Sequence, residues 1–199
     1  MKLVFATNNV HKLREARQIA GDGIEILSLN DIGCHEELPE TGDTITANSR
    51  QKANYVKDRY GFDCFADDTG LMVESLGGAP GVYSARYAGD EATPSENIRK
   101  LLSELEGKDD RNASFKTVVT LCIGGEEMQF EGEVEGEITR AHDGTDGFGY
   151  DPIFLARESG MTFARMTAEA KNAISHRGRA MRKLFQYLAE REKAGKNFY

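Results

Sequence analysis

The first third of the chain alternates short apolar runs with segments whose hydrophobic residues recur at helical spacing. Apolar runs typical of buried strands occupy residues 2–7, 24–29 and 62–66. A helix is expected after the first run, with Asn8 or Asn9 as its cap and Gly21 and Gly23 behind it. A second helix is expected over 44–60, closed by a glycine. The pattern therefore predicts a βαβαβ beginning, with a polar loop over 30–43.

The remainder of the chain predicts a long hairpin between helices. Thr93-Pro-Ser-Glu96 has capping-box spacing with proline at the first helical position, so a helix should run to about Leu105. Strands are expected at 114–123 and 126–138 around Gly124-Gly125, with alternating glutamates on a solvated face of the second strand. A strand at 152–156 and a helix over 176–193 follow. This order predicts an α/β fold with an elongated mixed β-sheet and flanking helices, and we treat 1–199 as one domain.

Composition narrows the possible partners. The chain of 199 residues carries a formal net charge of −8, which argues against nucleic acid or an anionic membrane surface as a partner. A triphosphate stays possible, because its binding depends on local cations. The three cysteines are isolated, which is typical of reduced residues in a cytosolic protein, and no apolar run is long enough for a signal peptide or a membrane span. Cytoplasmic localisation is expected.

Residues 7–12, Thr-Asn-Asn-Val-His-Lys, form a small polar loop between a predicted strand and a predicted helix. Unpaired amides at a helix N-terminus favour phosphate oxygens, and Lys12 adds a full positive charge there. The segment lacks the GxxxxGK[ST] pattern of a Walker loop. A capped helix with a solvent-exposed lysine is the simpler interpretation of this segment alone.

Two adjacent carboxylates, Asp67 and Asp68, directly follow the apolar run at 62–66. Neighbouring strand residues point to opposite faces, so we expect one aspartate to bind a metal ion and the other to support the loop. An Asx-type turn at the strand end is the alternative. Glu40, in Pro39-Glu-Thr-Gly42, is a further loop carboxylate. Because Mg²⁺ takes one or two protein carboxylates beside phosphates and water, Glu40 and one aspartate would suffice.

Cations and aromatic residues complete the inventory. Ser175 precedes His176 and Arg177, a cationic pair that opposes the dipole of the helix it begins and so modestly favours a ligand role. Lys52 and Lys171, taken alone, are typical of surface lysines. Residues 148–152, Phe-Gly-Tyr-Asp-Pro, suit a flat base, and a tight turn with core aromatics is the alternative interpretation of the segment taken alone.

Together these segments resemble the ITPase family, the Ham1-like pyrophosphatases also called XTP/dITP diphosphatases. The resemblance covers essentially the whole chain and rests on an ordered set of motifs: Lys2-Leu-Val-Phe-Ala-Thr-Asn-Asn, Glu40-Thr-Gly, Asp67-Asp-Thr-Gly-Leu71, Gly77-Gly-Ala-Pro-Gly81, Tyr83-Ser-Ala-Arg-Tyr87, Phe148-Gly-Tyr-Asp-Pro152 and Lys171-Asn-Ala-Ile-Ser-His-Arg177. Two positions depart from the family pattern. Thr69 replaces a common serine, and Ala47 replaces a common glutamate, which puts any role for that carboxylate in doubt.

The resemblance implies two lobes around a central active-site cleft, as in ITPase and Maf-like folds, and a homodimer. It implies Mg²⁺-dependent hydrolysis of ITP, dITP and XTP to the monophosphate and pyrophosphate, which would cleanse the nucleotide pool. By resemblance, Asp68 is catalytic and binds Mg²⁺ with Glu40, although reversed roles for Asp67 and Asp68 stay open. The expected substrate-binding residues are Thr7, Asn8, Asn9, Val10, His11, Lys12, Lys52, Thr69, Phe148, Gly149, Tyr150, Asp151, Lys171, His176 and Arg177.

Two alternatives remain. A nucleotide-binding sensor would use the same glycine-rich loops and cations without hydrolysis, but it has less need of both Glu40 and Asp68. A Maf-like pyrophosphatase acting on pyrimidine nucleotides would have a similar fold, but the Ser-His-Arg segment argues against it.

Overall fold

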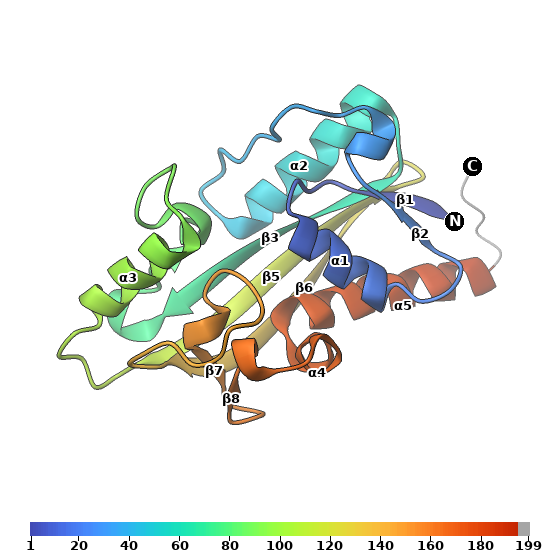
Figure 1. The fold of residues 1–199 in the computed structure, drawn as a ribbon. Coiled ribbons are helices and arrows are strands. Elements are labelled where there is room, and N and C mark those ends of the chain that lie inside the picture. The colour runs from blue at the N-terminus through green and yellow to red at the C-terminus, as the bar shows by residue number, and fades with distance from the viewer. Residues whose placement is uncertain (195–199) are drawn as a thin grey trace. The chain divides into compact units, whose positions relative to one another are not determined.

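The computed structural model describes residues 1–194 (Figure 1). The α-helices are α1 (Val10–Ile19), α2 (Ile45–Tyr60), α3 (Pro94–Glu104), α4 (Ala168–Ile174) and α5 (His176–Lys193). The strands are β1 (Lys2–Phe5), β2 (Glu25–Leu27), β3 (Cys64–Val73), β4 (Pro80–Gly81), β5 (Asn112–Ile123), β6 (Glu126–Ile138), β7 (Phe154–Ala156) and β8 (Met161–Thr162). Short 3₁₀ helices lie at Asn30–Ile32, Glu74–Leu76, Ser84–Arg86, Asp151–Ile153 and Phe163–Arg165.

The strands form one mixed sheet in the order β2-β1-β3-β5-β6-β7-β8, with β4 paired to β3. β1 runs parallel to both β2 and β3, as expected for the βαβαβ beginning. The β6-β7 and β7-β8 pairs are antiparallel. The predicted α/β class with a mixed sheet and flanking helices is thus confirmed.

The chain divides into two compact units. The first comprises residues 1–68, 117–132 and the part of α5 from Arg177. Because strand side chains alternate between faces, its central strands bury both. One face packs against α1 and α5 through Leu3, Phe5, Phe65, Leu121, Leu184 and Phe185. The other packs against α2 through Val4, Ala6, Cys64, Ala66, Cys122, Ala53 and Val56.

The second unit comprises residues 69–116 and 133–176. Its core joins Ile98 and Leu101 of α3, and Leu105 directly after that helix, to apolar residues of β3, β5, β6 and β7. Thr93 caps α3 in a complete capping box with Pro94 in the first turn, as the sequence predicts. The exposed and buried positions of β6 alternate, which confirms the solvated face that carries its glutamates.

Most predicted elements are present, but several boundaries differ. α5 spans 176–193 as predicted, and β5 and β6 flank a turn at Gly124-Gly125. β2 is shorter than 24–29, and the strand expected at 152–156 begins with a 3₁₀ turn before β7. β3 is longer than predicted and continues to Val73. β8 is an additional short strand that the hydrophobic pattern did not indicate.

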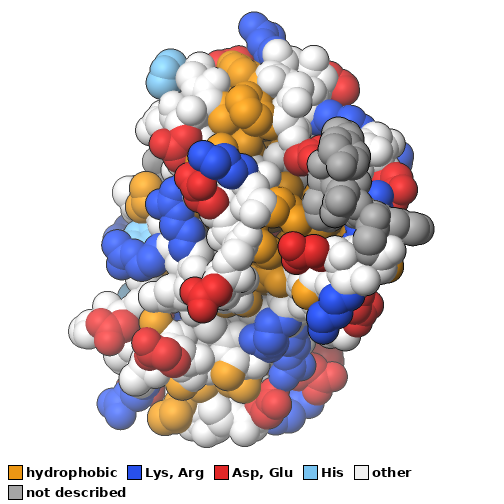
Figure 2. Space-filling model, turned by 90° about the vertical axis from the view of Figure 1, so that its right-hand side faces the viewer, with side chains coloured by type: hydrophobic (Ala, Val, Ile, Leu, Met, Phe, Trp, Pro, Cys, Tyr) orange, Lys and Arg blue, Asp and Glu red, His pale blue; other side chains and the backbone are white. Residues whose placement is uncertain are grey.

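On the face shown in Figure 2, acidic and basic side chains are interspersed among the described residues rather than gathered into one basic region. Cys34, Cys64 and Cys122 are buried, unbridged and members of one core cluster. Within residues 1–194, the helices are all too short or too polar to cross a membrane.

Candidate active site

Asp67 and Asp68 lie inside β3, not after its end, so the expectation of a strand ending at Ala66 was wrong. The strand continues through Gly70, where a Cβ atom would lie 2.9 Å from the backbone oxygen of Gly81 in β4. A glycine that resembles a turn signal therefore allows two strands to approach closely. Because both aspartates occupy strand positions, the alternative of an Asx-type turn is excluded.

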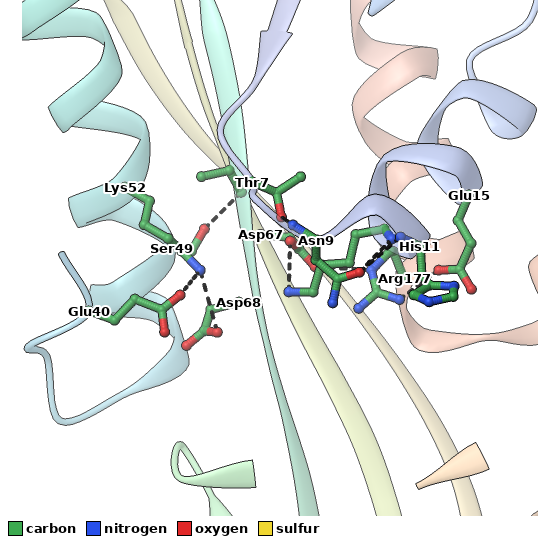
Figure 3. A network of polar contacts seen from close by, with 12 residues as sticks. Thr7, Asn9, His11, Glu15, Glu40, Ser49, Lys52, Asp67, Asp68 and Arg177 are labelled. Atoms are coloured by element: carbon green, nitrogen blue, oxygen red, sulfur yellow. Dashed lines mark hydrogen bonds and ion pairs between the residues drawn. The ribbon is translucent and has the colours of Figure 1, made fainter. Parts of the chain in front are cut away.

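Asp67 contacts two cations on one face of β3. Its Oδ1 lies 3.0 Å from Lys12 Nζ of α1. Its Oδ2 accepts a hydrogen bond from Arg177 Nε of α5 at 3.0 Å (Figure 3). Glu15 of α1 contacts the same guanidinium, with Oε2 2.6 Å from Arg177 Nη1. Burial raises the pKa of Asp67, but Lys12 and Arg177 outweigh it and hold that pKa below its ordinary range.

Asp68 faces a different cation. Lys52 Nζ of α2 lies 3.7 Å from Asp68 Oδ1 and also bonds Glu40 Oε1, so one ammonium group joins the two carboxylates (Figure 3). Asp68 is only 8% exposed, and its Oδ2 is buried without a hydrogen-bond partner among residues 1–194. Burial raises the pKa of Asp68 above its ordinary value, although Lys52 and Lys12 oppose this. The two aspartates thus have separate partners on opposite faces, as strand alternation predicts.

The pKa values of the two lysines shift in the same directions as those of the aspartates they contact. Burial lowers the pKa of Lys12, and the attraction of Asp67 only partly offsets the effects of burial, Lys52 and Arg177. Burial also disfavours the charged form of Lys52, but Asp68, Glu40 and Asp67 outweigh it and raise the pKa of Lys52. The structure therefore brings Lys12, Lys52, Glu40 and both aspartates together, and neither lysine is a surface residue.

The predicted phosphate loop is a capped helix start. Asn9 Oδ1 accepts hydrogen bonds from the backbone amides of His11, at 3.0 Å, and Lys12, at 3.2 Å. Thr7 Oγ1 accepts one from the Asn9 amide at 3.1 Å. The simpler interpretation of this segment was therefore correct about the cap but wrong about the lysine. Of the other loop residues, Asn8 and Val10 are exposed.

The loop that carries Glu40 is fastened to α2. Besides the contact between Glu40 and Lys52, the Gly42 amide donates to Asn48 Oδ1 at 2.7 Å. A Cβ atom on Gly42 would lie 2.7 Å from the Cβ of Ala47, so the loop approaches the helix at a small residue. Ala47, the departure from the family pattern, therefore packs against this loop and supplies no carboxylate.

A second attachment lies at the other end of the same loop. Glu36 Oε1 accepts hydrogen bonds from Tyr60 at 2.7 Å and Tyr55 at 3.0 Å, both near the end of α2. These hydrogen bonds, Tyr60 first, lower the pKa of Glu36 to about 2. The loop is thus held along α2 on both sides of residues 37–39.

In the second unit, Asp151 organises the predicted base-binding segment. Its Oδ2 accepts from the Phe148 amide at 2.8 Å and lies 2.7 Å from Lys171 Nζ, and both charged side chains are nearly fully buried. Lys171 Nζ also lies 4.6 Å from the centroid of the Phe148 ring, in a cation–π contact. Lys171 belongs to α4 and is not a surface lysine.

Two glycines shape the segment before Phe148. A Cβ atom on Gly147 would lie 2.2 Å from Asp151 Oδ2, and one on Gly144 would lie 2.6 Å from the backbone oxygen of Ala164. Both glycines have positive φ angles, +80° and +92°, that side chains rarely allow. The chain therefore closes tightly around the Asp151 carboxylate.

Two further predicted residues have clear packing roles. Tyr150 is buried in the core and donates from its hydroxyl to the backbone oxygen of Ser84 at 2.8 Å. His176 is buried, with its ring stacked on Phe115 at a centroid distance of 4.5 Å and on Phe163 at 6.1 Å. Phe148 is less buried and is therefore the better candidate for stacking on a base. Its neighbour Gly149 is also partly buried and would allow a base to approach the backbone closely. Thr69 follows Asp68 in β3 and is partly buried.

The donor set fits Mg²⁺. In the described part of the chain, the His, Cys, Asp and Glu side chains form no cluster of three or more able to enclose a metal ion. A buried, unpartnered carboxylate oxygen on Asp68, near a second carboxylate on Glu40, is nevertheless the small oxygen set that Mg²⁺ uses when phosphate and water complete its octahedron.

Fold and residues together define a Ham1-type protein. Residues 3–187 match the Ham1 family, and the chain therefore belongs to this family. It is 56% identical over 190 residues to a dITP/XTP pyrophosphatase of Christiangramia forsetii, covering 96% of this chain and all of that protein. A protein of the same name from Flavobacterium johnsoniae is 52% identical, with 94% and 98% covered. These relatives confirm both the family resemblance and the prediction that the chain is an enzyme.

Solved structures agree with this placement. A HAM1 protein from Coxiella burnetii has a TM-score of 0.88 at 38% identity, covering 96% of this chain and 99% of that one. The Ham1 protein of Staphylococcus aureus has a TM-score of 0.86 at 34% identity, covering 96% and 99%. These structures share the mixed α/β fold, with its open sheet and flanking helices, that was expected for this chain.

Glu15 was not among the predicted site residues. Its position three residues after Lys12 places the two on one side of α1, and this spacing is the only sequence signal that pointed to it. Its partner Arg177 is 162 residues away in sequence, a pairing that no local pattern predicts.

Proposed function

We propose that this chain hydrolyses deaminated purine nucleoside triphosphates, namely ITP, dITP and XTP, to the monophosphate and pyrophosphate. One observation carries the proposal: Asp68 and Glu40 share Lys52, while a buried oxygen of Asp68 lacks a hydrogen-bond partner in the part of the chain that the structure describes. Such an arrangement is costly in a resting protein and useful where a cation and phosphates bind. The names of the relatives supply the substrate class.

Asp68 and Glu40 would hold Mg²⁺. When bound, the ion supplies charge neutralisation at the phosphates and lowers the pKa of a coordinated water. Lys12 and Lys52 would bind triphosphate oxygens as compact positive charges, with Thr7, Asn8, Asn9, Val10, His11 and Thr69 lining the polyphosphate. Phosphoryl transfer needs this positioning and charge compensation more than it needs covalent catalysis.

Asp68 would also receive the proton of the attacking water. Its buried Oδ2, which has no hydrogen-bond partner among the described residues, is the atom that would face this water. The water oxygen forms a new bond to phosphorus as the α–β anhydride bond breaks, and pyrophosphate leaves. Asp68 thereby orients the water and accepts its proton.

Base selection would depend on the 6-oxo group of inosine and xanthine. From the family resemblance, the proposed base-recognition residues are Phe148, Gly149, Tyr150, Asp151, Lys171, His176 and Arg177. Of these, Tyr150 and His176 are packed in the core and would contribute mainly by holding their neighbours in place. Arginine and lysine side chains only donate hydrogen bonds, so they satisfy a 6-oxo acceptor and leave the 6-amino group of adenine unpaired. A site built for a specific hydrogen bond rejects the mismatched analogue strongly. The ring of Phe148 would add stacking affinity with little discrimination.

A pyrophosphate-release assay with Mg²⁺ tests the activity. ITP and XTP should turn over much faster than ATP, GTP or dTTP. Clear nucleotide binding without turnover of any of the five would instead identify a sensor, and a preference for dTTP would point to a pyrimidine-directed enzyme. Omission of Mg²⁺ should abolish turnover, and its return should restore it.

Base selection has its own test. The ratio of kcat/KM for ITP to that for ATP should fall sharply in Arg177→Ala, and an unchanged ratio would place selection elsewhere. Since Arg177 also neutralises Asp67 and Glu15, its removal disturbs neighbours as well. Arg177→Lys, which keeps the charge but not the planar fork, separates recognition from charge balance.

A homodimer is proposed from the family resemblance and from the frequency of two-fold dimers among soluble oligomers. Light scattering over a wide concentration range should give twice the mass of the chain. A monomer throughout would end this proposal without affecting the proposed chemistry.

A further inference from the structure

We infer that Asp67 is a positioning residue that joins Lys12 to Arg177, that Glu15 holds the same arginine from a second side, and that neither carboxylate binds metal. This inference rests on the proposed function, because it assigns the two cations their tasks with triphosphate and base. It separates the adjacent aspartates by role, with Asp68 alone in the chemistry.

The geometry of Asp67 supports this assignment. Its two oxygens are divided between two elements, with Oδ1 on Lys12 of α1 and Oδ2 on Arg177 of α5, each at 3.0 Å. The Asp67 side chain is fully buried and that of Arg177 is 3% exposed. Each oxygen therefore already has a charged partner, unlike Oδ2 of Asp68.

Charge balance explains why two carboxylates are needed. Lys12 and Arg177 share the Asp67 carboxylate, and like charges held this close repel strongly where water is excluded. One carboxylate cannot neutralise both cations. Glu15, 2.6 Å from Arg177 Nη1 and on the same helix as Lys12, supplies the second negative charge.

The strand sets the direction of each aspartate. Asp67 and Asp68 are consecutive in β3, so their side chains leave opposite faces of the sheet. Figure 3 shows Asp67 beside Asn9 and Arg177, and Asp68 beside Lys52 and Glu40. A single metal ion bound by Asp68 and Glu40 is therefore not placed to bind Asp67 as well.

The two carboxylates should produce different kinetic losses. Asp67 contacts both cations, so Asp67→Asn should raise KM for every triphosphate about tenfold or more and also reduce the preference for ITP over ATP. Glu15 contacts Arg177, so Glu15→Gln should reduce the ITP preference with a smaller rise in KM. Asp58→Asn, an exposed aspartate on α2, is the matched control and should change neither.

The Mg²⁺ requirement distinguishes positioning from metal binding. In Asp67→Asn and Glu15→Gln, the Mg²⁺ concentration for half-maximal rate should stay within about twofold of the parent value. In Glu40→Gln it should rise at least about tenfold. A large rise in Asp67→Asn, with KM for ITP unchanged at saturating Mg²⁺, would make Asp67 a metal ligand and overturn the inference.

A double-mutant cycle tests the link to Lys12. If Asp67 acts through this lysine, Lys12→Met with Asp67→Asn should lose little more kcat/KM than Lys12→Met alone. Fully additive losses would contradict the inference. Should Asp67→Asn fail to fold, the double variant, which removes both members of the ion pair, and Glu15→Gln carry the test.

The same assays separate this inference from the proposed function. A parent protein without pyrophosphate release overturns both. An active parent with a normal Asp67→Asn variant overturns this inference alone.

Discussion

The two faces of β3 at Asp67 and Asp68 carry the same side chain one residue apart, yet their surroundings differ. On one face, the Asp67 carboxylate has a cation at each oxygen and a pKa below the ordinary range. On the other, the Asp68 carboxylate shares one lysine with Glu40 and has a raised pKa, and one of its buried oxygens has no hydrogen-bond partner among the described residues. The charged form of the carboxylate is thus stabilised on the Asp67 face and destabilised by burial on the Asp68 face.

The comparison shows that partner geometry decides the role of a buried carboxylate. A buried charge with its hydrogen-bonding atoms satisfied supports the fold and positions its partners. A buried charge with an unsatisfied atom lowers stability and is characteristic of functional sites. The same sheet provides both because consecutive strand residues leave it in opposite directions.

The largest expected effect is on stability at Asp67. Asp67→Asn leaves Lys12 and Arg177 without a shared countercharge, and breaking a buried ion pair from one side costs about 3–5 kcal/mol. Asp68→Asn, by contrast, removes a carboxylate that burial destabilises and should change the free energy of unfolding little or raise it. Urea denaturation of both variants measures this difference. Equal losses at the two positions would contradict the comparison.

The next effect is on turnover at Asp68. Asp68→Asn removes charge and proton acceptance while keeping volume, and should reduce kcat with ITP on the order of a hundredfold or more. Circular dichroism and the melting temperature should show a folded protein. Near-normal activity at saturating Mg²⁺ would remove Asp68 from its proposed role.

Lys52 tests how the Asp68 face balances its charges. Lys52→Ala removes the ammonium group between Glu40 and Asp68, so KM for the triphosphate should rise about tenfold to a hundredfold, the value of one or two charge-assisted hydrogen bonds. The melting temperature should fall less markedly. Lys57→Ala, on the same helix, is the matched control. A large loss of stability with unchanged kinetics would make Lys52 structural.

The smallest effect is expected at Glu36, a much more exposed carboxylate on the Glu40 loop. Its pKa is lowered to about 2 by the tyrosine hydroxyls, so its contribution to stability is present above the unfolded pKa near 4.5 and is lost as the pH falls toward 2. Glu36→Gln should therefore melt below the parent at pH 7 and approach it near pH 2. Glu37→Gln, an exposed neighbour, should follow the parent at every pH.

Local sequence signals predicted much of the fold. Capping residues and hydrophobic spacing set the limits of α3 and α5, and the paired glycines set the hairpin between β5 and β6, because these features depend on neighbours in sequence. The end of β3 was misplaced because the apolar run stops at Ala66, whereas the strand continues through two buried aspartates and pairs with β4 beyond them.

The site was predicted by residue type more than by arrangement. Strand alternation correctly separated Asp67 from Asp68, but it did not show which aspartate meets which cation. Arg177 lies 110 positions from Asp67, and its contact depends on how α5 packs against the sheet. The stacking of His176 between aromatic rings depends likewise on tertiary packing, which a helix-dipole argument does not capture.

The glycines that precede Phe148 show that missing atoms can define a polar site. The carboxylate of Asp151 occupies space that a methyl group on residue 147 would need, and the backbone at Ala164 does the same for residue 144. The intervening Thr145 and Asp146 are exposed. Across a family of descendants, this loop should therefore drift freely at its middle two positions while its two glycines stay fixed, even though they contribute no functional group. Conservation at these two positions would then reflect the absence of a side chain and not the presence of a reactive group.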